Sequence, residues 1–118
     1  MSVPVMPTVG LNRIAALVQA ETTYIAAGIN NTAPSSADTA LGAENNRGAA
    51  TVVRDGNMVT FKVTLANAAL PAVTEEIGVF LNGGVGAGTG ELVVHALVNF
   101  TKGTDDLQLV VELTINEG

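Results

Sequence analysis

The sequence predicts a mainly β fold, an antiparallel β-sandwich of the jelly-roll type with one short N-terminal helix. Three observations predict this class. Apolar residues recur at helical spacing in one segment, several later segments alternate apolar with polar residues, and Gly-, Asn- or Asp-containing turns separate those segments at short intervals. Short strands that follow a single helix are typical of two sheets packed face to face. The length of 118 residues suits a single domain over residues 1–118.

The N-terminal part of the chain contains the expected arm and helix. Pro4 and Pro7 predict an extended arm over residues 1–8, because proline cannot join a central strand. Thr8 is the expected N-cap of a helix over residues 9–20. One apolar stripe runs along that helix and consists of Leu11, Ile14, Leu17 and Val18.

The next segment contains one strand and a long loop. Residues 23–29 are rich in β-branched and aromatic residues and predict a strand. The composition of residues 30–48 changes to Asn, Thr, Ser, Ala, Pro and Gly, which predicts a surface loop with one helical turn after Ser36. Loops of this length are usually functional or part of an interface.

The second half of the chain reads as strands joined by turns. Residues 49–54 and 58–66 flank Asp55-Gly56, which is a strong hairpin signal. In the second of these strands one face is expected to be buried, since Val59, Phe61, Val63 and Leu65 alternate with the residues between them.

Three more strands complete the predicted fold. They cover residues 73–81, 91–100 and 107–115, and a long Gly-rich loop over residues 82–90 joins the first two. In the middle strand we expect Leu92, Val94, Ala96, Val98 and Phe100 to share one face.

The composition excludes several classes of protein. Lys and Arg total 5 against 11 Asp and Glu, a net charge of −6, so the chain lacks the basic clusters of a nucleic-acid-binding protein. With no Cys and one His, it has neither a disulfide nor a Cys/His zinc site within one chain. Charged residues make up 14% and hydrophobic residues 47%, and a surface so poor in charge suits a protein packed against neighbours. The alternative is a small secreted or thermostable monomer whose surface is rich in Thr and Asn.

The sequence shows no signal for secretion or for membrane insertion. Residues 1–10 contain neither Lys nor Arg and are interrupted by prolines, unlike a signal peptide. No apolar run approaches the roughly 20 residues that cross a bilayer. We therefore expect a protein made in the cytoplasm, with no membrane partner.

No residue is assigned a catalytic, cofactor-binding or metal-binding role. The glycines at 83–90 do not form Gly-x-Gly-x-x-Gly, and His95 lies in a strand on the face opposite Leu92, where an exposed or interface histidine is expected. Glu75 and Glu76 are neighbours in a strand and point to opposite faces, so they cannot share one small site. Asp105-Asp106 occupies a turn, where local hydrogen bonding and a calcium site both remain open.

Sugar binding by aromatic stacking has little support in the sequence. The aromatic residues are Tyr24, Phe61, Phe80 and Phe100, there is no Trp, and at least two of the phenylalanines occupy positions expected in the core. Neither the chemistry nor the aromatic content points to an enzyme, and we expect none.

Several segments, in the same order, resemble motifs of small structural proteins of tailed bacteriophages, the tail-collar and tail-fibre-associated domains. They are Gly10-Leu11-Asn12-Arg13-Ile14, Tyr24-Ile25-Ala26-Ala27-Gly28, Thr32-Ala33-Pro34, Asp38-Thr39-Ala40-Leu41, Glu44 with Arg47, Gly56-Asn57-Met58-Val59-Thr60-Phe61, Thr74-Glu75-Glu76-Ile77-Gly78-Val79-Phe80-Leu81, Phe100-Thr101-Lys102 and Leu113-Thr114-Ile115. The resemblance covers nearly the whole chain. The chain departs from the family pattern in its extra Glu, in Val-Phe-Leu after Gly78 and in its long Gly-rich loop.

The resemblance implies a virion protein that works by assembly and without catalysis or cofactor. Its partners would be itself, as a cyclic homo-oligomer for which a trimer is a reasonable order, and other virion proteins of the tail fibre or collar. The arm and the loops 30–48 and 82–90 would make the contacts. The alternatives are a capsid decoration protein and a receptor- or glycan-binding module of the same fold.

Two of the shared positions carry expectations about structure. We expect Arg47 to pair with Glu76 or Glu44 and to tie the long loop to the sheet, the alternative being that Arg47 points to solvent. Gly78 in mid-strand predicts a bulge or a close approach of other groups to the backbone.

Overall fold

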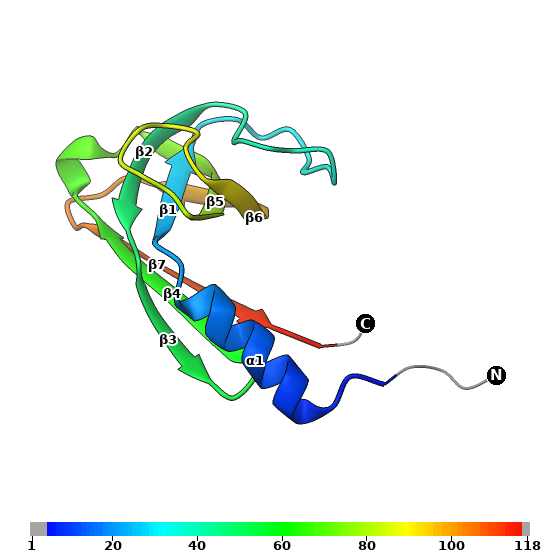
Figure 1. The fold of residues 1–118 in the computed structure, drawn as a ribbon. Helices are drawn as coiled ribbons and strands as arrows, with labels where there is room; N and C mark the ends of the chain where they lie inside the picture. The colour runs from blue at the N-terminus through cyan, green and yellow to red at the C-terminus, as the bar shows by residue number, and fades with distance from the viewer. Residues whose placement is uncertain (1–4, 117–118) are drawn as a thin grey trace.

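The computed structural model describes residues 5–116, which form one helix and seven strands (Figure 1). The elements in chain order are α1 (Thr8–Gln19), β1 (Thr23–Gly28), β2 (Glu44–Ala49), β3 (Thr51–Asp55), β4 (Met58–Leu65), the short 3-10 helix η1 (Asn67–Ala69), β5 (Val73–Leu81), β6 (Glu91–Thr101) and β7 (Leu107–Thr114). In the described part, no helix is long and apolar enough to cross a membrane.

The strands form two antiparallel sheets. One has the order β2-β1-β5-β6 and the other the order β3-β4-β7. The predicted mainly β sandwich with one N-terminal helix is thereby confirmed.

The two sheets are joined along one side and separate on the other. β2 runs into β3 through Ala50 alone, so the chain passes directly from one sheet to the next. β6 and β7 are therefore the edges on the opposite, open side (Figure 1). The β3-β4-β7 sheet projects beyond the four-stranded sheet with α1 along it, and the molecule measures 54 × 26 × 22 Å.

The core lies between the sheets and beneath α1. β4 contributes the alternating residues Val59, Phe61, Val63 and Leu65, which are all buried as predicted. Ile25, Ala27 and Val79 face them from the other sheet, and Ala15 is the fully buried residue of α1. The predicted stripe of the helix is only partly covered, since Ile14 and Leu17 are 37% and 54% exposed.

The start of the helix differs from the prediction. Thr8 is already helical and Pro7 is the N-cap, without a side-chain hydrogen bond. The carbonyl of Pro7 accepts the N–H groups of Gly10 and Leu11 at 2.9 and 3.1 Å. The helix can begin one residue early because proline has a φ near −60° and has no N–H to satisfy. Within the predicted arm, residues 5–7 precede the helix, and residues 1–4 lie outside the described residues.

The predicted loop 30–48 is too long at its C-terminal end. Residues 44–48 belong to β2, which pairs with β1 along the sheet edge. Polar Glu-Asn-Asn-Arg-Gly has low β-propensity, and the pairing with β1 overrides it. In place of the helical turn expected after Ser36 there is a β-turn over residues 35–38, closed by the Asp38 N–H on the Ser35 carbonyl at 3.0 Å.

The other strand predictions agree with the structure within a few residues, with two differences in detail. The β3–β4 hairpin has Gly56 and Asn57 as its loop, because Asp55 pairs with Met58. A glycine with φ +60° at the first loop position is the pattern of a type II′ turn.

The second difference concerns β6. Val94 pairs with Val79 and Leu92 pairs with Phe80, so Val93 is an extra residue that forms a bulge. Leu92 and Val94 therefore face opposite sides, and the prediction that they share one face is wrong. Leu92 instead lies on the face of His95, where it packs with Leu41, Ala26 and Phe80.

Candidate functional site

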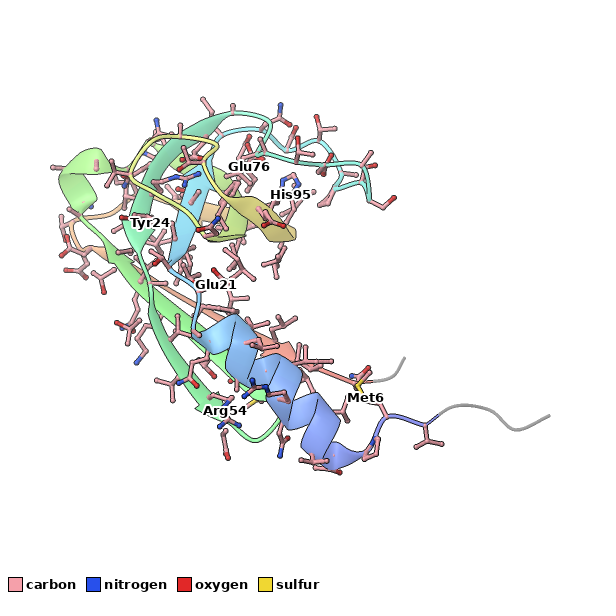
Figure 2. The ribbon with its side chains drawn as sticks, viewed as in Figure 1. Met6, Glu21, Tyr24, Arg54, Glu76 and His95 are labelled. Atoms are coloured by element: carbon pink, nitrogen blue, oxygen red, sulfur yellow. The ribbon has the colours of Figure 1, made fainter. Side chains whose placement is uncertain are left out.

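Several of the motif residues meet on the outer face of the four-stranded sheet, the face turned away from the core. Gly28 pairs with Glu76, and Ala26 and His95 both pair with Gly78. Figure 2 shows Glu76 and His95 side by side beneath the loop that precedes β2. We call this set of side chains, together with the loops 29–43 and 82–90 that cover it, the outer-face cluster.

His95 is held between two carboxylates. Its Nδ1 lies 2.8 Å from Oδ2 of Asp38, and its Nε2 lies 3.0 Å from Oε1 of Glu76. The imidazole is 10% exposed, so the expectation of an exposed histidine is wrong. Carboxylates only accept hydrogen bonds when ionised, so both contacts are satisfied when both ring nitrogens carry a proton.

Glu76 fastens both ends of the 29–43 loop to β5. Its carboxylate is 1% exposed and accepts the backbone N–H of Asn30 at 3.1 Å and those of Gly42 and Ala43 at 2.9 Å each. The carboxylate fits because residue 28 is a glycine. A Cβ there would lie 2.5 Å from Oε2 of Glu76 and 2.6 Å from the carbonyl oxygen of Ala43.

The environment favours the charged form of both carboxylates. Burial by itself would raise the pKa of Glu76, but the N–H groups of Ala43, Gly42 and Asn30 and the contact with His95 outweigh it and lower the pKa from its ordinary value of 4.5. The backbone N–H of Ser35 and then His95 lower the pKa of Asp38 from 3.8. The two carboxylates and the imidazole between them thus hold the loop against β5 and β6.

A second ion pair holds the Gly-rich loop. Arg47 donates from Nε and Nη2 to the two carboxylate oxygens of Glu44 at 2.6 and 2.8 Å. Its Nη1 donates to the carbonyl oxygens of Gly84 and Thr89 at 3.1 and 2.9 Å, and Glu44 in turn accepts the N–H of Gly88 at 3.1 Å. The guanidinium also lies over the ring of Phe80, 4.4 Å from its centroid.

A bulge in β2 makes this pair geometrically feasible. In a regular strand, residues three apart point to opposite faces. Asn46 pairs with Ala27 and Glu44 pairs with Gly28, so Asn45 is an extra residue. Glu44 and Arg47 therefore share the outer face. Of the two partners expected for Arg47, the structure selects Glu44, while Glu76 binds the other loop.

The remaining candidate residues lie elsewhere. The turn Asp105-Asp106 braces η1, since Oδ1 of Asp106 accepts the N–H of Asn67 at 2.9 Å and the Asn67 amide donates to the carbonyl of Asp105. Glu75 takes no part in the cluster around Glu76. Among residues 5–116, no group of three or more His, Asp or Glu side chains is placed to bind a metal ion. Each of the aromatic side chains Tyr24, Phe61, Phe80 and Phe100 is buried or half-buried.

Two hollows flank the cluster on either side of Asp38. The larger, about 370 Å³, is lined by Pro34, Ser35, Ser36, Asp38, His95 and the start of β6. The smaller, about 190 Å³, lies on the other side of Asp38 and is lined mainly by residues of the 29–43 loop. The lining of the larger hollow is mainly polar, so a ligand there would be held by hydrogen bonds.

Sequence reasoning did not assign Asp38 or Gly28 a role in this cluster. A Glu inside an otherwise apolar strand is one signal that could have found it, because a buried carboxylate requires several donors. No family model matches the chain, and no curated protein matches it significantly.

Proposed function

We propose that this chain is a structural protein of a tailed-phage virion, a homo-oligomeric sandwich associated with the tail fibre or collar that acts by protein–protein assembly without catalysis. The resemblance of its motifs supports the virion and the tail. The observation that supports assembly is an exposed, mainly apolar groove between α1 and the end of β5.

Exposed apolar residues occur on three elements, on different faces of the molecule. Ile14 and Leu17 of α1 border a groove of about 270 Å³ that Val18 and Leu81 also line. Val93 and Leu97 of β6 are 42% and 43% exposed, and Val110 of β7 is 52% exposed. Contiguous apolar side chains mark an interaction surface more strongly than scattered ones, and the residues that line the groove are contiguous.

The outer-face cluster has a supporting role in this proposal. Its buried ion pairs fix the 29–43 and 82–90 loops onto one sheet, and a loop held rigid loses less entropy when it binds a partner. Both loops thus offer preformed contact surfaces on the opposite face from the core.

Particles of the encoding phage provide the decisive test. We expect the chain in purified virions at a fixed ratio to the major structural proteins, with antibody label on the tail. Label on the head would favour the capsid decoration protein instead. Absence from washed particles, with the protein present in the infected-cell lysate, would overturn the structural role.

The alternative of a receptor- or glycan-binding module has one structural observation in its favour, the polar hollow beside His95. A glycan array, screened with and without calcium, tests it. Binding that Asp38→Ala removes would favour this alternative, whereas an array without signal would count against it.

A further inference from the structure

The four outer edges of the two sheets differ in how well they are protected against pairing with another strand. β2 and β6 each carry bulges, which interrupt the edge. β3 has five residues and ends in Arg54 and Asp55. β7 has no such protection. Its eight residues pair with β4 without a register shift, and they include no Pro, Lys or Arg.

β7 is also apolar on its inner side. Leu107, Leu109, Val111 and Leu113 point toward the core but remain half-buried, because the four-stranded sheet does not extend over this edge. On the outer side Val110 is 52% exposed. A long, regular and apolar edge of this kind is a template for a further strand.

We propose that β7 pairs with β7 of a second copy of this chain, antiparallel and across a two-fold axis at Val110, so that two three-stranded sheets become one continuous six-stranded sheet. The inference deepens the proposed assembly role and gives it a specific contact. A two-fold axis requires a surface that is complementary to itself, and the sequence of β7 meets that requirement.

The register follows from the alternation of the strand. Paired residues share a face, so inner residues must oppose inner residues. With the axis at Val110, Leu109 opposes Val111 and Leu107 opposes Leu113. On the outer face Val110 opposes Val110 of the second copy, and Gln108 opposes Glu112. The neighbour of each Glu112 carboxylate is therefore a neutral amide and not a second carboxylate. An axis at Val111 would instead place Val110 against Glu112.

The choice of a second copy, and not another extended segment, rests on this complementarity. On the inner face, aliphatic side chains of one half of the strand pair with aliphatic side chains of the other half. On the outer face, the Gln108 amide can donate a hydrogen bond to the Glu112 carboxylate. The half-buried stripe on the inner face would also continue across the axis into the same stripe of the second copy.

Charge substitutions at residue 108 test the register. Gln108→Glu would place two symmetry-related pairs of carboxylates opposite each other, and we expect the dimer dissociation constant to rise roughly tenfold. Gln108→Lys would create two opposite-charge pairs and lower it by a similar factor. Sedimentation equilibrium measures both. Equal constants for the two variants would overturn this register, because in the alternative register residue 108 opposes Thr114.

A single cysteine tests the axis. The chain has no cysteine of its own, so Val110→Cys introduces one thiol per copy. Directly opposed residues in an antiparallel pair have Cβ atoms about 5 Å apart, within reach of a disulfide after small adjustments. We expect mild oxidation to give a covalent dimer. The matched control is Val53→Cys, which lies on β3 at the other edge of the same sheet and is 59% exposed.

The outcomes separate this inference from the proposed function. A dimer in light scattering that Val110→Cys cross-links and Val53→Cys does not would support it. A trimer, or a dimer that neither thiol cross-links, would overturn the β7 contact and leave the assembly role standing. A monomer of 12.0 kDa at high concentration would overturn the β7 contact, and the particle experiment would then decide the assembly role.

Discussion

Arg47 is the residue with the most varied contacts in the outer-face cluster. Its side chain is 4% exposed and joins β2 to the Gly-rich loop through Glu44, Gly84 and Thr89, while its flat face lies against Phe80. Removing one partner of a buried ion pair leaves the other charge without compensation, which is the costly way to break such a pair.

We expect Arg47→Ala to destabilise the fold by about 3 kcal/mol. For a domain of this size that corresponds to a fall in Tm of roughly 10 °C, measured by calorimetry. We expect the Tm of Arg47→Lys to lie between those of the wild type and Arg47→Ala, because an ammonium keeps the charge but cannot bind both carboxylate oxygens in a fork. The matched control is Arg13→Ala, on the exposed side of α1. An unchanged Tm in Arg47→Ala would show that the pair does not stabilise the protein.

Glu76 makes the free energy of unfolding depend on pH in the acidic range. Its pKa is lower in the folded chain than the ordinary 4.5, so between these two values the unfolded chain binds more protons. The stabilisation is therefore present above pH 4.5 and is lost as the pH falls through the folded pKa. Asp38 acts in the same direction, from its ordinary value of 3.8 downward.

We expect the free energy of unfolding, measured with urea, to fall between about pH 5.5 and pH 3. In Glu76→Gln the fall should be smaller, and stability near neutral pH should be lower by about 2 kcal/mol, because the Gln amide cannot accept all of the N–H groups that the carboxylate accepts. Glu75→Gln is the control at the neighbouring position. A wild-type pH profile retained in Glu76→Gln would contradict the assignment.

Sequence reasoning identified both charged residues but not their full set of partners. Arg47 was expected to bind Glu44 or Glu76, and the structure places it on Glu44. Which of the two carboxylates binds Arg47 depends on the bulge at Asn45 and on the register that brings Gly28 opposite Glu76. Neither is encoded in the spacing of residues within one strand, because each arises from pairing between strands.

At the scale of elements, the best predicted strands are those with a strong local pattern. The segment 73–81 coincides with β5, and the alternation in β4 marks its buried face correctly. β2 was missed because an edge strand on a loop-covered sheet can be polar. The face of Leu92 was predicted wrongly since one extra residue, Val93, reverses the alternation.

The junction of β1 with its following loop depends on a single missing side chain. We expect Gly28→Ala to displace the Glu76 carboxylate, because the new Cβ would also meet the backbone oxygen of Ala43, which cannot move as a side chain can. The N–H groups of Gly42 and Ala43 would then lose their acceptor, and hydrogen exchange at these amides should accelerate at least tenfold.

The control for this variant is Gly103→Ala, where a Cβ would meet nothing within 4 Å. Its amide exchange should match the wild type throughout. If Gly28→Ala left Gly42 and Ala43 as protected as before, the fastening of the loop would have to rest on contacts other than those of Glu76.

At the scale of the whole molecule, the low proportion of charged residues is consistent with a surface built for contact with other protein. The chain is rich in Thr, Asn and Ala, and apolar residues of α1, β6 and β7 are also exposed. The net charge of −6 acts against self-association, because identical copies repel each other. In the assembly proposed above, apolar contact and backbone pairing would have to overcome this repulsion.

This balance predicts how self-association responds to salt. The β7 contact contains no ion pair across its axis, so salt can only screen the repulsion between copies. Raising NaCl from about 0.05 M to about 0.5 M shortens the screening length several-fold, and we expect the dimer dissociation constant in sedimentation equilibrium to fall. The Gln108→Lys variant is the internal control, since its added opposite-charge pairs weaken with salt and its response should be smaller. A wild-type association that weakens as salt rises would mean that ion pairs drive it and would contradict an apolar contact at β7.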